Sequence, residues 1–273
     1  MPPSAILAKY ARRVAASGSL LCVGLDCALE RIPERFRGEP QPQLAFNRFI
    51  IEQTHSFVSA YKPNIAFYEA RGADGLRELA LTLDHLRTHH PDIVTICDAK
   101  RGDNRTTNQA YATAIFDQLG FDSVTLQPYM GRAVLEPFLA RHDKGCIVLC
   151  RTSNPGDAEL QELSVRCEGG EHKPLWRVVA ERVRDHWNER GNCMLVVGAT
   201  VPAVLREVRA LAPDLPILAP GIGEQGGDVE LATRAGVDAS GGGLFLSASR
   251  SVIFSADPAR EACALRDAIN SFR

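Results

Sequence analysis

Short apolar runs alternate with amphipathic stretches along the whole chain. Eight of these runs predict β-strands, at 20–26, 59–64, 93–100, 123–128, 146–153, 194–200, 216–221 and 243–249. The stretches that follow them repeat apolar positions with helical spacing, which predicts helices at 42–58, 73–89, 106–119, 133–142, 175–190, 202–211, 229–235 and 258–270. One more amphipathic stretch predicts a short helix at 4–16, ahead of the first strand.

Eight strand-plus-helix units predict a parallel α/β fold, because parallel strands need a crossover helix between them. A single (β/α)8 TIM barrel with a short N-terminal helix fits this count best, and an open doubly wound sheet is the alternative. No low-complexity linker divides the chain, so we expect one domain over 1–273. The segment 154–173 contains two glycine-containing turns and predicts an extended, irregular loop after the fifth strand.

Composition and charge exclude several classes of function. The chain has 273 residues, 45% hydrophobic and 23% charged, as is typical of a globular domain. Its net charge of -2 provides no positive field for nucleic acid or an anionic membrane. No apolar run approaches the ~18 residues of a membrane span, and the N-terminal stretch lacks a signal-peptide core, so we expect a cytoplasmic protein.

The eight cysteines do not have the spacing of a zinc ribbon. Four of them lie inside apolar runs, where a free thiol behaves as a small buried side chain: Cys22, Cys97, Cys146 and Cys150. We therefore expect reduced core thiols and no metal site.

Charged residues collect where the predicted strands end, and the carboxyl ends of barrel strands carry the chemistry in this fold. The clearest group ends the third strand as Asp98-x-Lys100-x-x-Asp103. Strand alternation places Asp98 and Lys100 on one face about 7 Å apart, and Lys62 ends the preceding strand. Such a group is either a buried ion-pair network that closes the barrel or a device for proton transfer.

Two other strand ends suggest a binding site for an anion. After the seventh strand, the glycines of Gly221-x-Gly223-x-x-Gly226 resemble a dinucleotide fingerprint, but they come too late in the chain for one. A turn at this point of a barrel suits a phosphate group, and Arg250 after the eighth strand adds a guanidinium. The alternative is a plain turn beside a surface arginine. Ser153 lies at the end of the fifth strand. A lone serine there does not indicate a binding role, so Ser153 is a candidate only together with these neighbouring motifs.

Taken in order, these motifs resemble orotidine 5'-phosphate decarboxylase in its longer bacterial form. The resemblance extends from Leu20 to Arg250 and is carried by Leu25-Asp26, Lys62, Asp98-x-Lys100-x-x-Asp103 with Thr107, Ser153-Asn-Pro-Gly, Pro220-Gly-x-Gly-x-Gln225-Gly-Gly-Asp and Arg250.

The resemblance implies decarboxylation of orotidine 5'-phosphate to uridine 5'-phosphate, without metal or organic cofactor, by a homodimer with shared active sites. It implies that Lys100 donates the proton and that Asp98 lies beside the departing carboxylate. It implies that Lys62 and Asp103 complete the charge array, with Asp103 and Thr107 supplied by the partner subunit. The implied substrate contacts are Asp26 and Lys62 with the ribose, Ser153 with the base, and Gln225 and Arg250 with the phosphate, with Pro220 in the same substrate-binding set.

Two positions depart from the family pattern. Asn104 stands where an apolar residue is usual, and Asn64 stands where longer relatives often have Gln. Three other classes stay open: a magnesium-dependent sugar-phosphate decarboxylase or synthase, a Schiff-base aldolase, and a phosphate-binding barrel without activity. An aldolase needs a neutral lysine, whereas Asp98 and Asp103 favour the charged form of Lys100.

Overall fold

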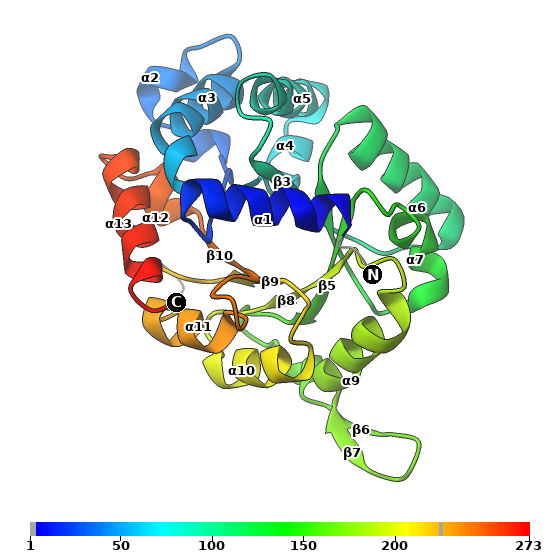
Figure 1. Cartoon of the computed structure of the whole chain (residues 1–273). Coiled ribbons are helices and arrows are strands. Elements are labelled where there is room, and N and C mark those ends of the chain that lie inside the picture. Colours follow the sequence, from blue (N-terminus) through cyan, green and yellow to red (C-terminus); the bar gives the residue numbers. More distant parts are fainter. Residues whose placement is uncertain (1–3, 224–225) are drawn as a thin grey trace.

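Eight parallel strands close into a barrel, as the strand count predicts (Figure 1). The computed structural model describes residues 4–223 and 226–273. Around the barrel the strand order is β1-β2-β3-β4-β5-β8-β9-β10, and β10 pairs with β1. The closed ring confirms the (β/α)8 prediction and excludes the open sheet. The strands are Leu21–Gly24 (β1), Ala60–Lys62 (β2), Val94–Arg101 (β3), Ser123–Leu126 (β4), Gly145–Arg151 (β5), Cys193–Val197 (β8), Ile217–Pro220 (β9) and Leu244–Ala248 (β10).

The predicted helices form an outer layer around the strands (Figure 1). They are α1 (Ala5–Ser17), α3 (Pro42–Thr54), α5 (Gly72–His89), α6 (Arg105–Ala112), α7 (Arg132–Leu139), α9 (Leu175–Arg182), α10 (Pro202–Leu211), α11 (Val229–Gly236) and α13 (Pro258–Asn270).

Several helix ends differ from the prediction. The last turns of three predicted helices change pitch, into a 3-10 turn at His55–Phe57 (η2) and π-helical turns at Thr113–Gln118 (η3) and Val183–Trp187 (η4). Single-turn helices carry too few residues for a periodic pattern, so the sequence did not predict them. They are η1 (Leu29–Arg31), α2 (Glu34–Arg37), α4 (Ala66–Glu69), α8 (Ala158–Gln161) and α12 (Arg250–Ile253).

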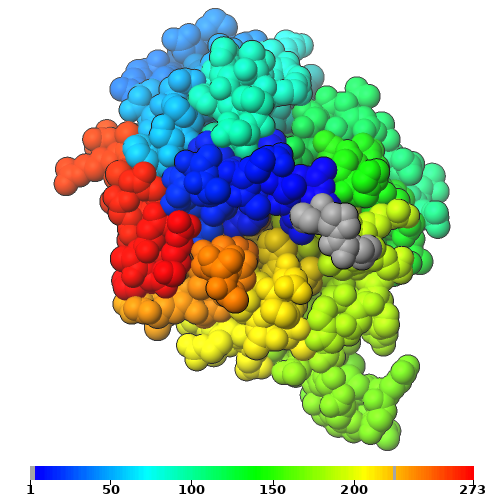
Figure 2. All heavy atoms as spheres, viewed as in Figure 1, coloured from blue at the N-terminus to red at the C-terminus, as the bar shows by residue number. Residues whose placement is uncertain are grey.

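Helix α1 covers the end of the barrel where the strands begin, and its position is visible in both whole-chain views (Figures 1 and 2). The Tyr10 hydroxyl donates to the carbonyl of Leu244 (2.8 Å) and accepts from the Leu244 amide (3.0 Å). The Lys9 ammonium lies 2.7 Å from Asp122, just ahead of β4. Ile6 and Tyr10 join a buried cluster of inward-facing strand residues that includes Met194 and Phe245. Packed side chains therefore fill this end, and polar groups are left to the opposite mouth.

The loop predicted as irregular at 154–173 contains ordered structure. It holds α8 and an antiparallel hairpin of β6 (Ser164–Arg166) and β7 (His172–Pro174), which projects from the body of the molecule (Figures 1 and 2). Gly169 and Gly170 make its turn at φ of 101° and 86°, a region that glycine enters without strain. Three-residue strands are too short to show alternation in the sequence.

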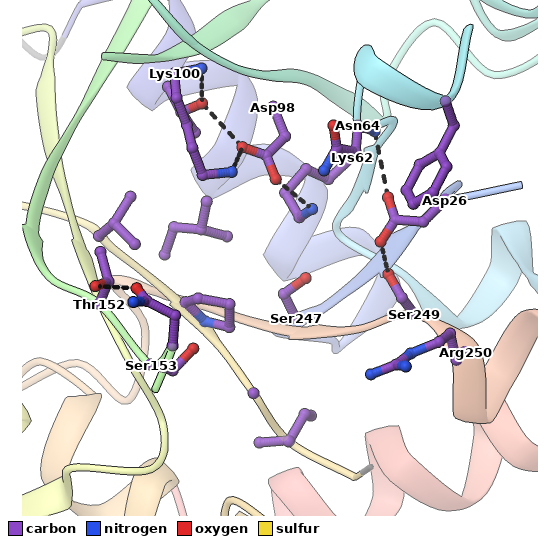
Figure 3. Close-up of a pocket in the computed structure, with 18 of the residues that line it drawn as sticks. Asp26, Lys62, Asn64, Asp98, Lys100, Thr152, Ser153, Ser247, Ser249 and Arg250 are labelled. Carbon is purple, nitrogen blue, oxygen red and sulfur yellow. Dashed lines mark hydrogen bonds and ion pairs between the residues drawn. The ribbon is translucent and has the colours of Figure 1, made fainter. Parts of the chain in front are cut away.

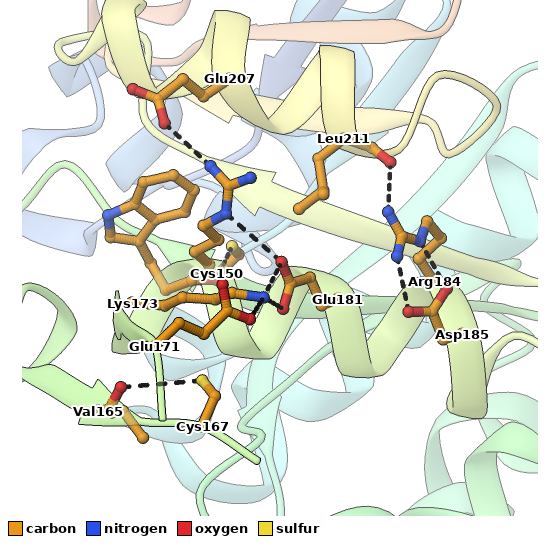
Figure 4. A network of polar contacts seen from close by, with 12 residues as sticks. Cys150, Val165, Cys167, Glu171, Lys173, Glu181, Arg184, Asp185, Glu207 and Leu211 are labelled. Atoms are coloured by element: carbon orange, nitrogen blue, oxygen red, sulfur yellow. Dashed lines mark hydrogen bonds and ion pairs between the residues drawn. The ribbon is translucent and has the colours of Figure 1, made fainter. Parts of the chain in front are cut away.

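Ion pairs hold the base of this hairpin against α9. The Lys173 ammonium lies between the carboxylates of Glu171 (2.8 Å) and Glu181 (3.0 Å) (Figure 4). The buried Arg151 guanidinium, at the end of β5, pairs with Asp157 and with Glu162 (2.8 Å). The α8 segment that leads into the hairpin is thus attached to the end of β5, two residues before Ser153.

All eight cysteines are unpaired, and the four inside apolar runs are buried, as predicted. Among the described residues, no helix has the length and apolar character needed to cross a membrane. One domain over 1–273 stays a prediction.

Candidate active site

The end of β3 departs from regular strand geometry at Lys100. Its φ of +47° is the only positive value among the described residues other than glycine. The pairing of β3 with β4 also shifts register between Cys97 and Arg101. The predicted meeting of Lys100 with Asp98 is confirmed at 2.7 Å between Nζ and Oδ1. This contact lies at an irregular strand end, and simple strand alternation did not predict the irregularity.

Asp98 is the centre of the polar network at the mouth (Figure 3). Its Oδ2 lies 3.1 Å from the Lys62 ammonium, and its Oδ1 accepts from the Thr125 hydroxyl (3.0 Å) as well as from Lys100. Burial alone raises the pKa of this carboxyl, but the Lys62 and Lys100 ammonium groups outweigh burial and hold it well below its usual range. Asp98 is therefore ionised at neutral pH.

Lys62 is the more enclosed of the two cations, with 7% of its side chain exposed against 46% for Lys100. Burial alone lowers the pKa of Lys62, but the carboxylates of Asp98 and Asp26 outweigh it and raise the pKa above its ordinary value. The network therefore has one largely buried cation, Lys62, and one more exposed cation, Lys100, and both border the cavity.

Asp26 follows β1 and is fixed by two neighbouring strand ends. Its Oδ1 accepts from the Asn64 amide (3.2 Å), and its Oδ2 accepts from the Ser249 hydroxyl (2.5 Å). Gly24 makes this approach possible, because a Cβ there would lie 1.7 Å from Ser249 Oγ. Asn64, which departs from the family pattern, uses its side-chain oxygen to accept from the Ala66 amide (3.2 Å).

These groups line a cavity of about 430 Å³ at the carboxyl ends of the strands. Ser153, Pro220 and Arg250 line the same cavity, with Ser153 and Arg250 lying away from Asp98 in the view of Figure 3. Ser153 packs so closely on Gly198 that a Cβ there would lie 2.7 Å from the Ser153 Cβ. The structure thus brings seven predicted site residues to one cavity: Asp26, Lys62, Asp98, Lys100, Ser153, Pro220 and Arg250.

The glycine-rich turn after β9 borders this cavity through Gly221 and Ile222. Gly221 and Gly223 have φ of 108° and 82°, and the Gly227 amide donates to the Gly221 carbonyl (3.0 Å), which closes the turn. Arg250 follows β10, begins α12 and is exposed. Gln225, also predicted as a phosphate ligand, lies outside the described residues.

Two predicted site residues do not line the cavity of their own chain, namely Asp103 and Thr107. Asp103 is exposed, and its carboxylate accepts from the Asn104 amide (2.6 Å). Asn104 caps α6, because its side-chain oxygen accepts from the Thr107 amide (3.1 Å) and hydroxyl (3.0 Å). An asparagine in place of the usual apolar residue therefore has a local structural role.

Sequence reasoning missed Thr125, which is buried in β4. Its hydroxyl accepts from the amides of Ala99 (3.0 Å) and Lys100 (2.9 Å) while donating to Asp98. A threonine inside an apolar run gives no signal of such a role. Arg31 of η1 and Ser247 of β10 also line the cavity and were not predicted.

The cavity offers a poor set of donors for a divalent metal ion. Its carboxylates among the described lining residues are Asp26 and Asp98. Asp98 already faces two ammonium groups, and their charge opposes a bound cation.

A closed parallel barrel with a lysine-carboxylate-lysine array at its mouth is the architecture of a TIM-barrel enzyme, whose site lies at the carboxyl ends of the strands. Residues 19–265 match the model of the Orotidine 5'-phosphate decarboxylase / HUMPS family, and the chain belongs to this family.

Named relatives agree with this assignment. The chain is 46% identical over 262 residues to an orotidine 5'-phosphate decarboxylase of Azoarcus sp., covering 93% of this chain and 94% of that protein. It superposes on the Leishmania donovani OMP decarboxylase with a TM-score of 0.86 and 38% identity, covering 98% of both chains. It also matches Leishmania donovani UMP synthase with a TM-score of 0.87 and 40% identity; there the match covers 97% of this chain and 56% of that one.

The position of Thr125 leads to a prediction on stability. Thr125→Val keeps the side-chain shape but leaves two amides and one carboxylate oxygen without this partner. We expect a loss of about 1–3 kcal/mol in the free energy of unfolding, measured by urea denaturation. Thr125→Ser retains the hydroxyl and is the matched control, with a loss within about 1 kcal/mol for the missing methyl group. Equal losses in both variants would contradict a role for the hydroxyl.

Proposed function

We propose that the protein is a carboxy-lyase that converts orotidine 5'-phosphate into uridine 5'-phosphate and CO2, the last step of de novo pyrimidine biosynthesis. The observation that carries the proposal is the array of Lys62, Asp98 and Lys100, with the Lys100 ammonium opening into the cavity. The family match and the names of the relatives support the same activity.

The chemistry of this substrate explains why such an array is needed. Loss of CO2 from C6 of the pyrimidine leaves an electron pair in the plane of the ring, where no adjacent group can delocalise it. Stabilisation then has to come from a fixed positive charge that faces C6 before the bond breaks. In our proposal the Lys100 ammonium supplies this charge and afterwards donates its proton to C6, which gives the product.

Asp98 has two tasks in this proposal. Its contact with Lys100 (2.7 Å) orients the ammonium, so little reorganisation is needed during the reaction. Its own negative charge lies beside the substrate carboxylate, which favours departure of that group as neutral CO2. Lys62 keeps Asp98 ionised from the enclosed side (3.1 Å).

The rest of the cavity suits a nucleoside monophosphate. Asp26 and Lys62 are our candidates for the ribose hydroxyls, and Ser153 is our candidate for the base. Arg250, the turn at Gly221 and Gln225 are our candidates for the phosphate, with Pro220 bordering the substrate. Binding of the phosphate far from C6 can provide energy for closing the site over the reacting ring.

The alternative activity is that of a magnesium-dependent sugar-phosphate decarboxylase or synthase of the same barrel type. The family description includes HUMPS proteins, so the family match alone does not decide between the two. The two cations on Asp98 favour the decarboxylase, because a magnesium ligand needs a carboxylate free of competing charge. We propose that no metal or organic cofactor takes part.

We also propose a homodimer with shared active sites. Asp103 and Thr107 lie outside the cavity of their own chain, and Asp103 is exposed. In a dimer, Asp103 would complete the array of the neighbouring subunit. We place the enzyme in the cytoplasm, with a small-molecule substrate and no nucleic-acid or membrane partner.

The first prediction from the proposed function concerns the proton donor. Lys100→Ala removes both the proton and the charge that faces C6, so we expect kcat/KM to fall by at least about 10⁴-fold. The loss of orotidine 5'-phosphate absorbance measures turnover, and circular dichroism measures folding. Lys144→Ala, at the opposite end of the barrel, is the matched control and should retain activity. Near-normal turnover by folded Lys100→Ala protein would contradict the assignment.

The second prediction concerns the shared site. A heterodimer of Lys100→Ala and Asp103→Ala chains has one site with both lesions and one intact site if Asp103 acts on the neighbour. Co-refolding two inactive variants should then restore about half of the sites in each heterodimer, measured by the same assay after separating the differently tagged species. If Asp103 acts within its own chain, every site keeps one lesion, and proven heterodimers without activity would contradict the shared site.

The third prediction concerns Arg250. Arg250→Ala removes a charge-assisted contact to phosphate, so kcat/KM for orotidine 5'-phosphate should fall by about 10²-fold or more. Turnover of the phosphate-free nucleoside should hardly change, because it has no group for Arg250 to bind. A proportional loss on both substrates, together with a lower melting temperature, would assign Arg250 a structural role.

A further inference from the structure

A cluster of imidazoles and one carboxylate lies outside the cavity, where α5 packs against α3 (Figure 1) and His55 stacks on His90. It contains four of the seven histidines of the chain: His55, His85, His89 and His90. The fifth member is Glu52 of α3. Histidines are uncommon enough that this concentration at one helix contact needs an explanation, and the reaction at the barrel mouth does not supply one.

The nitrogen atoms converge on one carboxylate oxygen. Glu52 Oε1 lies 2.9 Å from His85 Nε2 and 3.5 Å from His90 Nε2. His55 stacks on His90 with ring centroids 4.4 Å apart. Glu52, His55 and His90 each place one potential ligand atom within 4.8 Å of the other two.

The donor set matches a divalent transition-metal ion. Zinc takes neutral imidazole nitrogen and carboxylate oxygen at about 2.0–2.2 Å, usually with four ligands. Glu52, His55 and His90 supply one carboxylate oxygen and two imidazole nitrogens, and a water molecule can take the fourth position.

Two guanidinium groups, those of Arg13 and Arg48, lie close enough to act on His55 and His85 respectively. The Arg13 guanidinium is paired with Asp92 (2.6 Å) and also binds the backbone carbonyls of Val58 and His55. Glu52 has 53% of its side chain exposed, so it can rotate and shorten the ligand spacing to the roughly 3.4 Å of a tetrahedral zinc site.

We propose that Glu52, His55 and His90 form a binding site for a divalent transition-metal ion of the zinc type. His85, with 9% of its side chain exposed, holds the Glu52 carboxylate from the protein side. A partner of this kind orients a metal ligand and strengthens binding. A bound ion would tie α3 and η2 to the end of α5 at the closed end of the barrel, where it stabilises the fold.

The test measures zinc binding to the full-length protein after chelator treatment and removal of the chelator, by isothermal titration calorimetry. We expect one zinc ion per chain and a rise in melting temperature with added zinc. Glu52→Gln and His90→Gln should each weaken zinc binding at least tenfold and remove the thermal shift, and His85→Gln should weaken binding by about 10–100-fold. His142→Gln, which changes an exposed histidine outside the cluster, is the matched control and should bind as the unchanged protein does.

Cobalt identifies the ligands independently of stability. One equivalent of Co²⁺ should give the visible bands of a nitrogen and oxygen site, without the thiolate charge-transfer band that binding at Cys167 or Cys263 would produce. Circular dichroism and turnover of orotidine 5'-phosphate confirm that each variant folds. The proposal is overturned if the folded protein binds no zinc, if the cluster variants bind it as tightly as the control, or if the cobalt spectrum shows thiolate ligands.

Discussion

The ion pairs that Asp98 makes with Lys62 and Lys100 are the constraint on which the site depends. Three charged groups meet at the end of two strands, and the two ammonium groups keep the Asp98 carboxylate ionised. Because the folded pKa of Asp98 lies below its unfolded value, its pairing stabilises the folded chain at neutral pH, and this contribution is lost only as the pH falls through the depressed pKa. A purely structural network would be enclosed, whereas 46% of the Lys100 side chain is exposed toward the cavity. The exposure favours proton transfer over simple closure of the barrel.

The barrel provides the rigidity that this array needs. Helix α1 and the buried strand side chains fill one end, so the ionisable groups are confined to the mouth, where the strands end. Thr125 connects β4 to the irregular end of β3 and fixes the backbone that carries Lys100. Close packing at Gly24 lets the chain after β10 approach the end of β1, and close packing at Gly198 lets the loop after β5 approach the end of β8. Electrostatic catalysis requires such preorganisation, because a charge that has to move during the reaction stabilises the transition state less.

Sequence periodicity predicted the eight strands and the long helices because each buries one face or stripe over many residues. It could not predict the β6–β7 hairpin or α12, whose few residues form no repeating pattern. The residue types at the strand ends predicted Asp26, Lys62, Asp98 and Lys100 as neighbours. The role of Thr125 depends on the register between β3 and β4, and the left-handed φ of Lys100 depends on a local irregularity. Neither feature can be inferred from the sequence of one strand alone. The histidine cluster joins residues from two helices, so it appears only when the chain is folded.

The ionisation of Asp98 is the most direct test of this account. Protein labelled with ¹³C at the aspartate carboxyl carbons can be titrated by NMR, with Asp98→Asn identifying the resonance. The account predicts that the Asp98 signal keeps the chemical shift of a carboxylate from pH ~8 down to pH ~3, past the ordinary aspartate pKa of about 3.9, as long as the chain stays folded. An inflection at or above that ordinary value in the folded protein would contradict it, since Lys62 and Lys100 would then not hold Asp98 in its charged form.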